Sequence, residues 1–123
     1  MLPRLTDART VQSWVISQPF PARGAIPVPH VSVPLFNGIP ALGLGTYPLS
    51  GGHCVETITM AIGLGYRHID TAQMYGNERE VGQAIASCGL PRGQLFVTTK
   101  VDPGNCSKAR FSESVKRSVE ALG

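Results

Sequence analysis

Apolar residues after position 31 recur with two alternating periods, and these periods predict a chain of strands and helices. Helices are predicted where apolar residues recur at intervals of three and four, and strands where short apolar runs lie between turn residues. The predicted order is strand 42–45, helix 53–64, strand 66–70, helix 77–88, strand 95–100 and helix 107–122. Strands that alternate with helices of this length predict an α/β fold with a parallel sheet. The pattern alone leaves open whether that sheet closes into a barrel.

Each predicted helix carries an apolar stripe that we expect to face the core. The stripes are Val55, Ile58, Ala61 and Ile62 in the first helix, Val81, Ala84, Ile85 and Cys88 in the second, and Phe111, Val115, Val119 and Leu122 in the third. The glutamates of these helices are expected to be solvated charges on the opposite faces. They are Glu56, Glu78, Glu80, Glu113 and Glu120.

Turn residues mark the boundaries of several elements. Asn37-Gly38 lies between two short apolar runs, which predicts a hairpin with a type I′ turn, because both central positions of that turn need positive φ. Gly65 is expected to end the first helix in the left-handed conformation. Asn77 is expected to cap the start of the second helix.

Polar side chains gather where the second and third strands end. Asp70 closes one strand, Tyr75 lies in the following loop, and Lys100 closes the next strand. Because the ends of neighbouring parallel strands meet at one edge of a sheet, we expect these three side chains to lie close together. A phenol with a pKa of about 10 is a weak acid near neutral pH, but a nearby ammonium stabilises its phenolate and lowers that pKa. The alternative is a packed tyrosine beside a structural Asp–Lys pair.

Three segments resemble the aldo-keto reductase family. The stretch 65–82 is similar to the family signature, Thr98-Thr99-Lys100 is similar to the segment with the catalytic lysine, and 36–47 is similar to the opening hairpin and first strand. The resemblance covers about 31–123 and is strongest to the bacterial 2,5-diketogluconate and methylglyoxal reductase branch.

This resemblance implies a fold and a reaction. The fold is the first part of a TIM (β/α)8 barrel, about three βα units after the hairpin. The reaction is the NADPH-dependent reduction of small aldehydes or ketones to alcohols. Tyr75 would be the general acid, Lys100 would stabilise the phenolate, and Asp70 would hold Lys100 in place. The family's catalytic histidine follows a fourth strand, and no position of this chain matches it.

The resemblance also implies contacts to the cofactor. Gly45, Thr46 and Tyr47 would contact the nicotinamide ribose, and Asp70 would lie near the ring. Tyr47 is a further candidate to line the substrate pocket, although Gly45 and Thr46 could simply turn the chain. The segment 43–45 is only a G-x-G and lacks the third glycine of a dinucleotide fingerprint, which disfavours a Rossmann fold.

The length of the chain limits the whole prediction. A (β/α)8 barrel needs roughly 250 residues, and this chain has 123. We therefore expect a partial reductase domain over 31–123 that is inactive by itself. The alternative is a non-catalytic remnant or an assembly partner that associates through an exposed sheet edge. Residues 1–30 are proline-rich without periodicity and are predicted to be a disordered or unrelated extension, with a basic transit peptide as the alternative.

Composition excludes or disfavours several other classes. The net charge is only +3 and the cations are dispersed, which disfavours nucleic-acid binding. No apolar run reaches 18 residues, so no membrane helix is predicted. The three cysteines are widely spaced, which predicts reduced thiols in the cytoplasm and no metal site.

Overall fold

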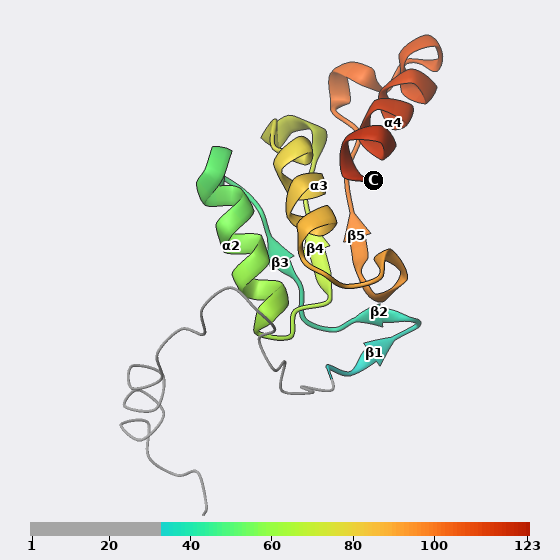
Figure 1. Ribbon diagram of the computed structural model, residues 1–123. Helices are drawn as coiled ribbons and strands as arrows, with labels where there is room; N and C mark the ends of the chain where they lie inside the picture. The colour runs from blue at the N-terminus through green and yellow to red at the C-terminus, as the bar shows by residue number, and fades with distance from the viewer. Residues whose placement is uncertain (1–32) are drawn as a thin grey trace, which may run out of the picture.

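The computed structural model describes residues 33–123, so the predictions for 1–30 lie outside the described residues. Three parallel strands form a sheet in chain order: β3 (Leu44–Gly45), β4 (His68–Asp70) and β5 (Phe96–Thr98). Each strand is followed by a helix: α2 (Gly51–Gly63), α3 (Glu78–Ser87) and α4 (Lys108–Leu122). Figure 1 shows these helices in a row beside the sheet. The predicted alternation and parallel pairing are confirmed, whereas closure into a barrel stays a prediction.

A two-stranded hairpin precedes the parallel sheet. Its strands, β1 (Leu35–Phe36) and β2 (Ile39–Pro40), pair antiparallel. The turn residues Asn37 and Gly38 have φ of 51° and 82°, so both central positions have the positive φ that a type I′ turn needs. The predicted hairpin is confirmed, and Figure 1 shows it at the end of the sheet where the parallel strands begin.

Helix α2 is terminated by Gly65 in the left-handed conformation, as predicted. Gly65 has φ of 102°, and its N–H donates to the carbonyl of Ile62 at 3.0 Å. The N–H of Tyr66 donates to the carbonyl of Ala61, also at 3.0 Å. This pair of bonds is the Schellman motif, which satisfies carbonyls that the helix leaves free. It turns the chain directly into β4.

The apolar core lies between the helices and one face of the sheet. Its buried members are Cys54, Ile58, Ile62, Ile69, Val81, Ala84, Ile85, Leu95 and Leu122. The stripes predicted for α2 and α3 are confirmed at six of eight positions, since Val55 and Cys88 are only partly buried and pack against the edge of the core. Ile69 points into this core from β4, and because side chains alternate along a strand, its neighbours His68 and Asp70 point to the opposite face.

The predicted buried face of α4 is wrong at two positions. Phe111 is 47% exposed and Val119 is 63% exposed, whereas Ser114 and Ser118 are buried beside Leu122. The hydroxyls of both serines make hydrogen bonds inside the protein, and a hydrogen-bonded hydroxyl can be buried at little cost. Prediction from hydrophobicity alone misses such a face.

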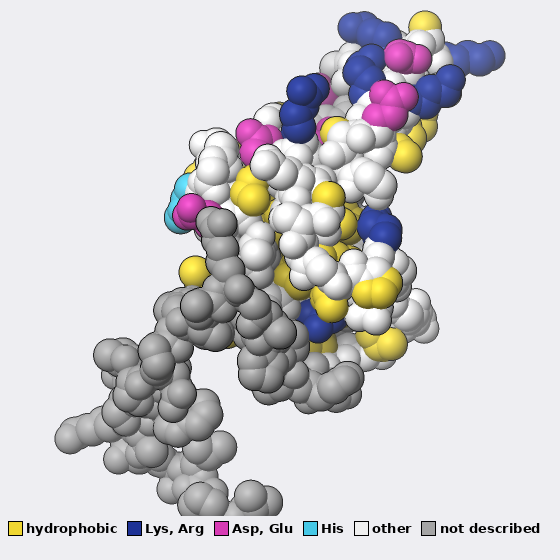
Figure 2. Space-filling view, viewed as in Figure 1, with side chains coloured by type: hydrophobic (Ala, Val, Ile, Leu, Met, Phe, Trp, Pro, Cys, Tyr) yellow, Lys and Arg dark blue, Asp and Glu magenta, His cyan; other side chains and the backbone are white. Residues whose placement is uncertain are grey.

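The outer surface of α4 carries charges of both signs. Lys108, Arg110, Lys116 and Arg117 are exposed there together with Glu113 and Glu120, as Figure 2 shows at the top of the molecule. Arg117 lies 3.9 Å from Glu113. This mixture of charges gives no continuous basic surface on that helix, and the prediction against nucleic-acid binding stays a prediction. In the described part of the chain, no helix has the length and apolar character needed to cross a membrane.

The contact between α3 and α4 depends on Gly82, which gives a prediction for stability. A Cβ added at Gly82 would collide with the backbone carbonyl of Ala121. Alanine normally stabilises a helix by about 1 kcal/mol relative to glycine, but overpacking costs about 1–3 kcal/mol. We expect Gly82→Ala to lower the free energy of unfolding in urea titrations. The control Gly52→Ala, in open space within α2, should raise the free energy of unfolding. A Gly82→Ala variant more stable than wild type would show that α3 and α4 are not packed this closely.

Candidate active site

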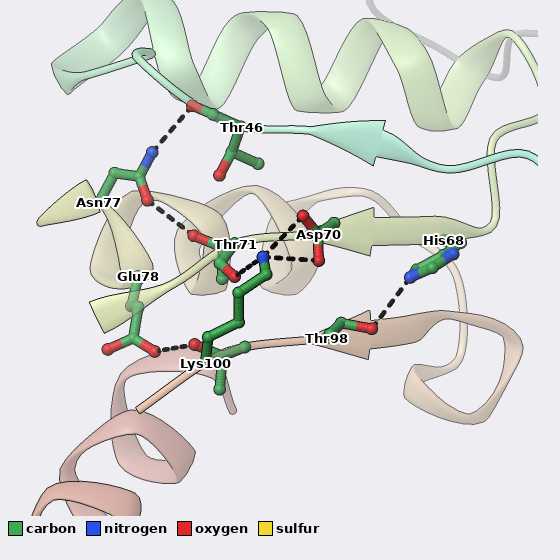
Figure 3. Close-up of polar contacts among 9 residues, drawn as sticks. Thr46, His68, Asp70, Thr71, Asn77, Glu78, Thr98 and Lys100 are labelled. Carbon is green, nitrogen blue, oxygen red and sulfur yellow. Dashed lines mark hydrogen bonds and ion pairs between the residues drawn. The ribbon is translucent and has the colours of Figure 1, made fainter. Parts of the chain in front are cut away.

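The ends of β4 and β5 bring together an acid and an amine. Asp70 is the last residue of β4, and Lys100 follows β5 by two residues. The ammonium Nζ of Lys100 donates to both carboxylate oxygens of Asp70, at 2.9 and 2.8 Å. It also donates to the backbone carbonyl of Thr71 at 2.9 Å. Figure 3 shows the lysine reaching across to both acceptors.

Tyr75 lies beside this ion pair in the loop after β4. It ends the short 3-10 helix η1 (Gln73–Tyr75), and the chain turns away at Gly76, where φ is 66°. The Nζ atom of Lys100 lies 5.3 Å from the centre of the Tyr75 ring. The structure thus brings together Asp70, Tyr75 and Lys100, as the order of the strands predicts. Their catalytic roles stay predictions at this point.

The electrostatics of the ion pair keep Lys100 protonated. Desolvation lowers the pKa of Lys100, but the hydrogen bond and negative charge of Asp70, with further contributions from Tyr75, outweigh it and raise that pKa above 10.5. Since the folded protein raises the pKa, the contribution of the pair to stability is present below about pH 10.5. That contribution disappears as the pH rises through the raised value, and it is small because the lysine side chain is 49% exposed.

Removing the negative charge of Asp70 should therefore lower the pKa of Lys100. In Asp70→Asn we expect this pKa to fall below its wild-type value, because desolvation then acts with less opposition. An NMR titration of the lysine side-chain carbon next to Nζ measures it directly. Glu113→Gln, which removes an equal charge from the far side of α4, is the control and should leave the value unchanged. An unchanged pKa in Asp70→Asn would contradict the pairing.

The three residues predicted to contact the nicotinamide ribose differ in accessibility. Gly45 pairs with Asp70 in the sheet register, is exposed, and has nothing within 4 Å of the place where a Cβ would lie. Tyr47 is 71% exposed, and its ring centre lies 5.2 Å from that of Tyr75. Thr46 is fully buried; its N–H donates to the carbonyl of Asp70 at 2.9 Å, and its hydroxyl has no partner among the described residues. Gly45 and Tyr47 therefore offer surface to a ligand next to Asp70.

Asn77 has a larger role than the sequence indicates. It lies at the N-cap of α3, but its side chain makes no capping hydrogen bond. Its amide instead donates to the carbonyls of Thr46 and Leu49, at 3.1 and 2.9 Å, and accepts from the hydroxyl of Thr71 at 2.8 Å. Figure 3 shows it between the loops that follow β3 and β4. The predicted side-chain cap is wrong, because these backbone carbonyls are better placed partners for the buried amide.

Glu78 also differs from its prediction as a solvated charge. Its carboxylate accepts from the hydroxyl of Thr99 at 2.6 Å and from that of Ser118 at 3.1 Å. Both partners are distant in sequence, so the helical pattern contains no signal for them.

His68 lies two residues before Asp70, where its ring contacts the hydroxyl of Thr98 at 3.0 Å and packs edge-on against Phe96. These contacts give His68 a structural role within the sheet.

The site thus consists of a carboxylate–ammonium pair beside a tyrosine, at the ends of parallel strands. The sequence model of the aldo/keto reductase family matches residues 34–123, and the chain belongs to that family.

Among described residues, no group of three or more His, Cys, Asp or Glu side chains is placed to hold a metal ion.

Individual relatives agree with this assignment. The chain is 48% identical over 84 residues to methylglyoxal reductase DkgB of Salmonella typhi, which covers 68% of this chain and 32% of the relative. It is 41% identical over 99 residues to an aldo-keto reductase of Mycolicibacterium vanbaalenii, which covers 80% and 36%. The chain thus spans about a third of the length of the curated relatives it matches.

Solved structures resemble the described fold. An aldo/keto reductase from Brucella melitensis superposes with a TM-score of 0.66 at 39% identity, over 69% of this chain and 33% of that one. An aldo-keto reductase of Bombyx mori in complex with NADP superposes with a TM-score of 0.62 at 35% identity, over 69% and 31%. These likenesses extend the family assignment from the sequence to the arrangement of strands and helices.

Proposed function

We propose that this chain is part of an NADPH-dependent reductase that converts small aldehydes or ketones to alcohols. The observation that carries the proposal is the grouping of Asp70, Tyr75 and Lys100 at the ends of β4 and β5. The named methylglyoxal reductase among the relatives supports a small dicarbonyl as the substrate. The NADP complex of a neighbouring structure supports the cofactor.

The proposed chemistry assigns one task to each residue. NADPH, when bound, supplies the hydride that reduces the carbonyl carbon. The phenol of Tyr75 donates its proton to the carbonyl oxygen, which would otherwise carry the developing negative charge. The ammonium of Lys100 then lies near the phenolate and stabilises it, and it holds this position because Asp70 and the carbonyl of Thr71 accept hydrogen bonds from it.

The residues near Asp70 fit the nicotinamide end of the cofactor. Gly45 leaves the backbone bare at the strand end, so a flat ring or a ribose can approach closely. Tyr47 presents an exposed ring on the same side, near Tyr75. We assign only this end of NADPH to the described residues, and we propose that the phosphates are bound by loops outside them.

The proposed enzyme is a complete (β/α)8 barrel of which β3, β4 and β5 are three strands. Within the described part, β3 and β5 each pair with only one neighbour. An open three-stranded sheet leaves the face that carries the site without the strands that would enclose it. We therefore propose that the 123 residues alone do not catalyse turnover.

The cytoplasmic location is also part of the proposal, supported by the free thiols of Cys54, Cys88 and Cys106.

A second candidate function is assembly without catalysis. The outer edge of β5 has no partner strand among the described residues, and Phe111 and Val119 expose apolar surface on α4. An unpaired strand edge and exposed apolar side chains both favour association with another chain. A non-catalytic partner or remnant would show concentration-dependent association by light scattering and no turnover in any form of the protein.

The test compares the protein expressed from its complete coding sequence with the 123 residues alone. We expect the first to oxidise NADPH when methylglyoxal is added and to quench or enhance NADPH fluorescence on binding. We expect the second to bind weakly or not at all and to show no rate. Absence of turnover in both, with cofactor binding in neither, would overturn the reductase proposal and favour assembly.

A further inference from the structure

Ser118 on α4 connects two side chains of the loop and helix that follow β4. Its hydroxyl is buried, accepts from Nε2 of Gln73 at 2.9 Å, and donates to Oε2 of Glu78 at 3.1 Å. Because a serine hydroxyl is both a donor and an acceptor, one atom serves both partners. No apolar residue at this position could do so, which explains why the buried face of α4 is polar here.

The two partners of Ser118 hold the backbone on both sides of Lys100. Glu78 accepts from the hydroxyl of Thr99, the residue before Lys100, at 2.6 Å. The N–H of Gln73 donates to the carbonyl of Lys100 at 3.1 Å. The side-chain Oε1 of Gln73 accepts from the N–H of Asp102 at 3.0 Å. Figure 3 shows Glu78 pointing toward the strand end that carries Lys100.

The contacts of Lys100 with Asp70 and the carbonyl of Thr71 anchor its ammonium, but they do not by themselves fix the strand end that carries the residue. The side chain is 49% exposed and its partner Asp70 is 34% exposed, and an exposed ion pair contributes little to fixing a conformation. A lysine also has a flexible four-carbon stem. The position of Nζ relative to the ring of Tyr75 therefore depends on how firmly the strand end is held.

We propose that Ser118, acting through Gln73 and Glu78, is a positioning residue for Lys100. This inference rests on the proposed function, since Lys100 matters there as the group that stabilises the phenolate of Tyr75. The competing account is that Ser118 only fastens α4 to α3. That account predicts a loss of stability without any change at Lys100.

Ser114 provides a matched control on the same helix. It is also buried, and its hydroxyl donates to the carbonyl of Phe111 in its own turn. Its backbone carbonyl accepts from Nε2 of Gln73 at 3.2 Å, a contact that alanine at this position keeps. Ser118→Ala and Ser114→Ala therefore make the same chemical change at two buried sites, and only the first interrupts the connection to Lys100. Thr99→Val removes the hydrogen bond from Thr99 to Glu78, which is the contact nearest Lys100. Thr99→Ser keeps the hydroxyl and should keep that hydrogen bond.

The experiment measures the pKa of Lys100 by NMR titration in all four variants, together with kcat and KM of the protein from its complete coding sequence. For Ser118→Ala and Thr99→Val we expect that pKa to fall, and kcat to fall about tenfold with KM unchanged, since a small misplacement of a catalytic group is costly. Ser114→Ala and Thr99→Ser should resemble wild type in both. Equal values for Ser118→Ala and Ser114→Ala, or an unaffected Thr99→Val, would overturn the inference.

The two readouts separate this inference from the proposed function. The pKa of Lys100 reports whether the contacts of Ser118 position that lysine, whether or not the protein reduces a carbonyl. A protein without turnover but with a lowered pKa in Ser118→Ala and Thr99→Val would support the positioning contacts and refute the reductase activity. A fully active Ser118→Ala would refute the positioning role alone.

Discussion

Tyr75→Phe is expected to abolish carbonyl reduction, with kcat lowered by about 10²–10⁴-fold. The substitution removes only the phenolic oxygen, which is the proposed source of the proton. The ring remains to pack beside Tyr47 and under Lys100, so the fold and cofactor binding should be retained. The measurement is the steady-state rate of NADPH oxidation with methylglyoxal, alongside NADPH binding by fluorescence.

Tyr66→Phe is the control for this substitution. Tyr66 is a half-buried tyrosine between α2 and β4, away from the ion pair, and loss of its hydroxyl should leave kcat near the wild-type value. If Tyr75→Phe retained a rate similar to that of Tyr66→Phe, another group would have to donate the proton. The assignment of Tyr75 would then be wrong, even if the protein were a reductase.

Lys100→Met is also expected to lower the rate of carbonyl reduction strongly. Methionine keeps an unbranched side chain of similar length but has no charge, so it cannot stabilise a phenolate. It also leaves the carboxylate of Asp70 without its partner. We expect kcat to fall by about 10²-fold or more, since an electrostatic contribution of this kind is worth several kcal/mol in a transition state. The decline of activity at high pH should move to higher pH, because the ammonium no longer lowers the pKa of the phenol; a pH–rate profile would show this.

Lys108→Met removes the same charge from the exposed start of α4 and serves as the control. It should leave both the rate and its pH dependence unchanged. A fully active Lys100→Met would contradict the proposed stabilisation and would reduce the Asp70–Lys100 pair to a structural contact. Loss of NADPH binding in this variant, with normal turnover at saturating cofactor, would assign Lys100 to binding instead.

The sequence predicts those features that depend on local chemistry or on strand order. Gly65 ends α2 because only a residue without Cβ takes its positive φ easily. Asp70, Tyr75 and Lys100 meet because parallel strands bring their C-terminal ends to one edge. Neither prediction needs any knowledge of which side chains are neighbours in the folded protein.

The features that the sequence does not predict are those with long-range polar partners. Asn77 is a residue type that often caps helices, yet its partners Thr46 and Leu49 lie about thirty residues earlier. Ser118 falls on a face of α4 that hydrophobicity alone assigns to solvent, because its partners Gln73 and Glu78 appear only once the helices have packed. Buried polar groups of this kind have no periodic signal.

The proposed mechanism requires the phenol of Tyr75 to donate the proton during hydride transfer beside Lys100. A single-turnover experiment tests it most directly, with NADPH prebound to wild type and to Tyr75→Phe and the absorbance of the reduced nicotinamide followed after methylglyoxal is mixed in. We predict equal cofactor binding and a rate of hydride transfer at least about 10²-fold slower in the variant. A transfer rate in Tyr75→Phe equal to that of wild type would contradict the claim.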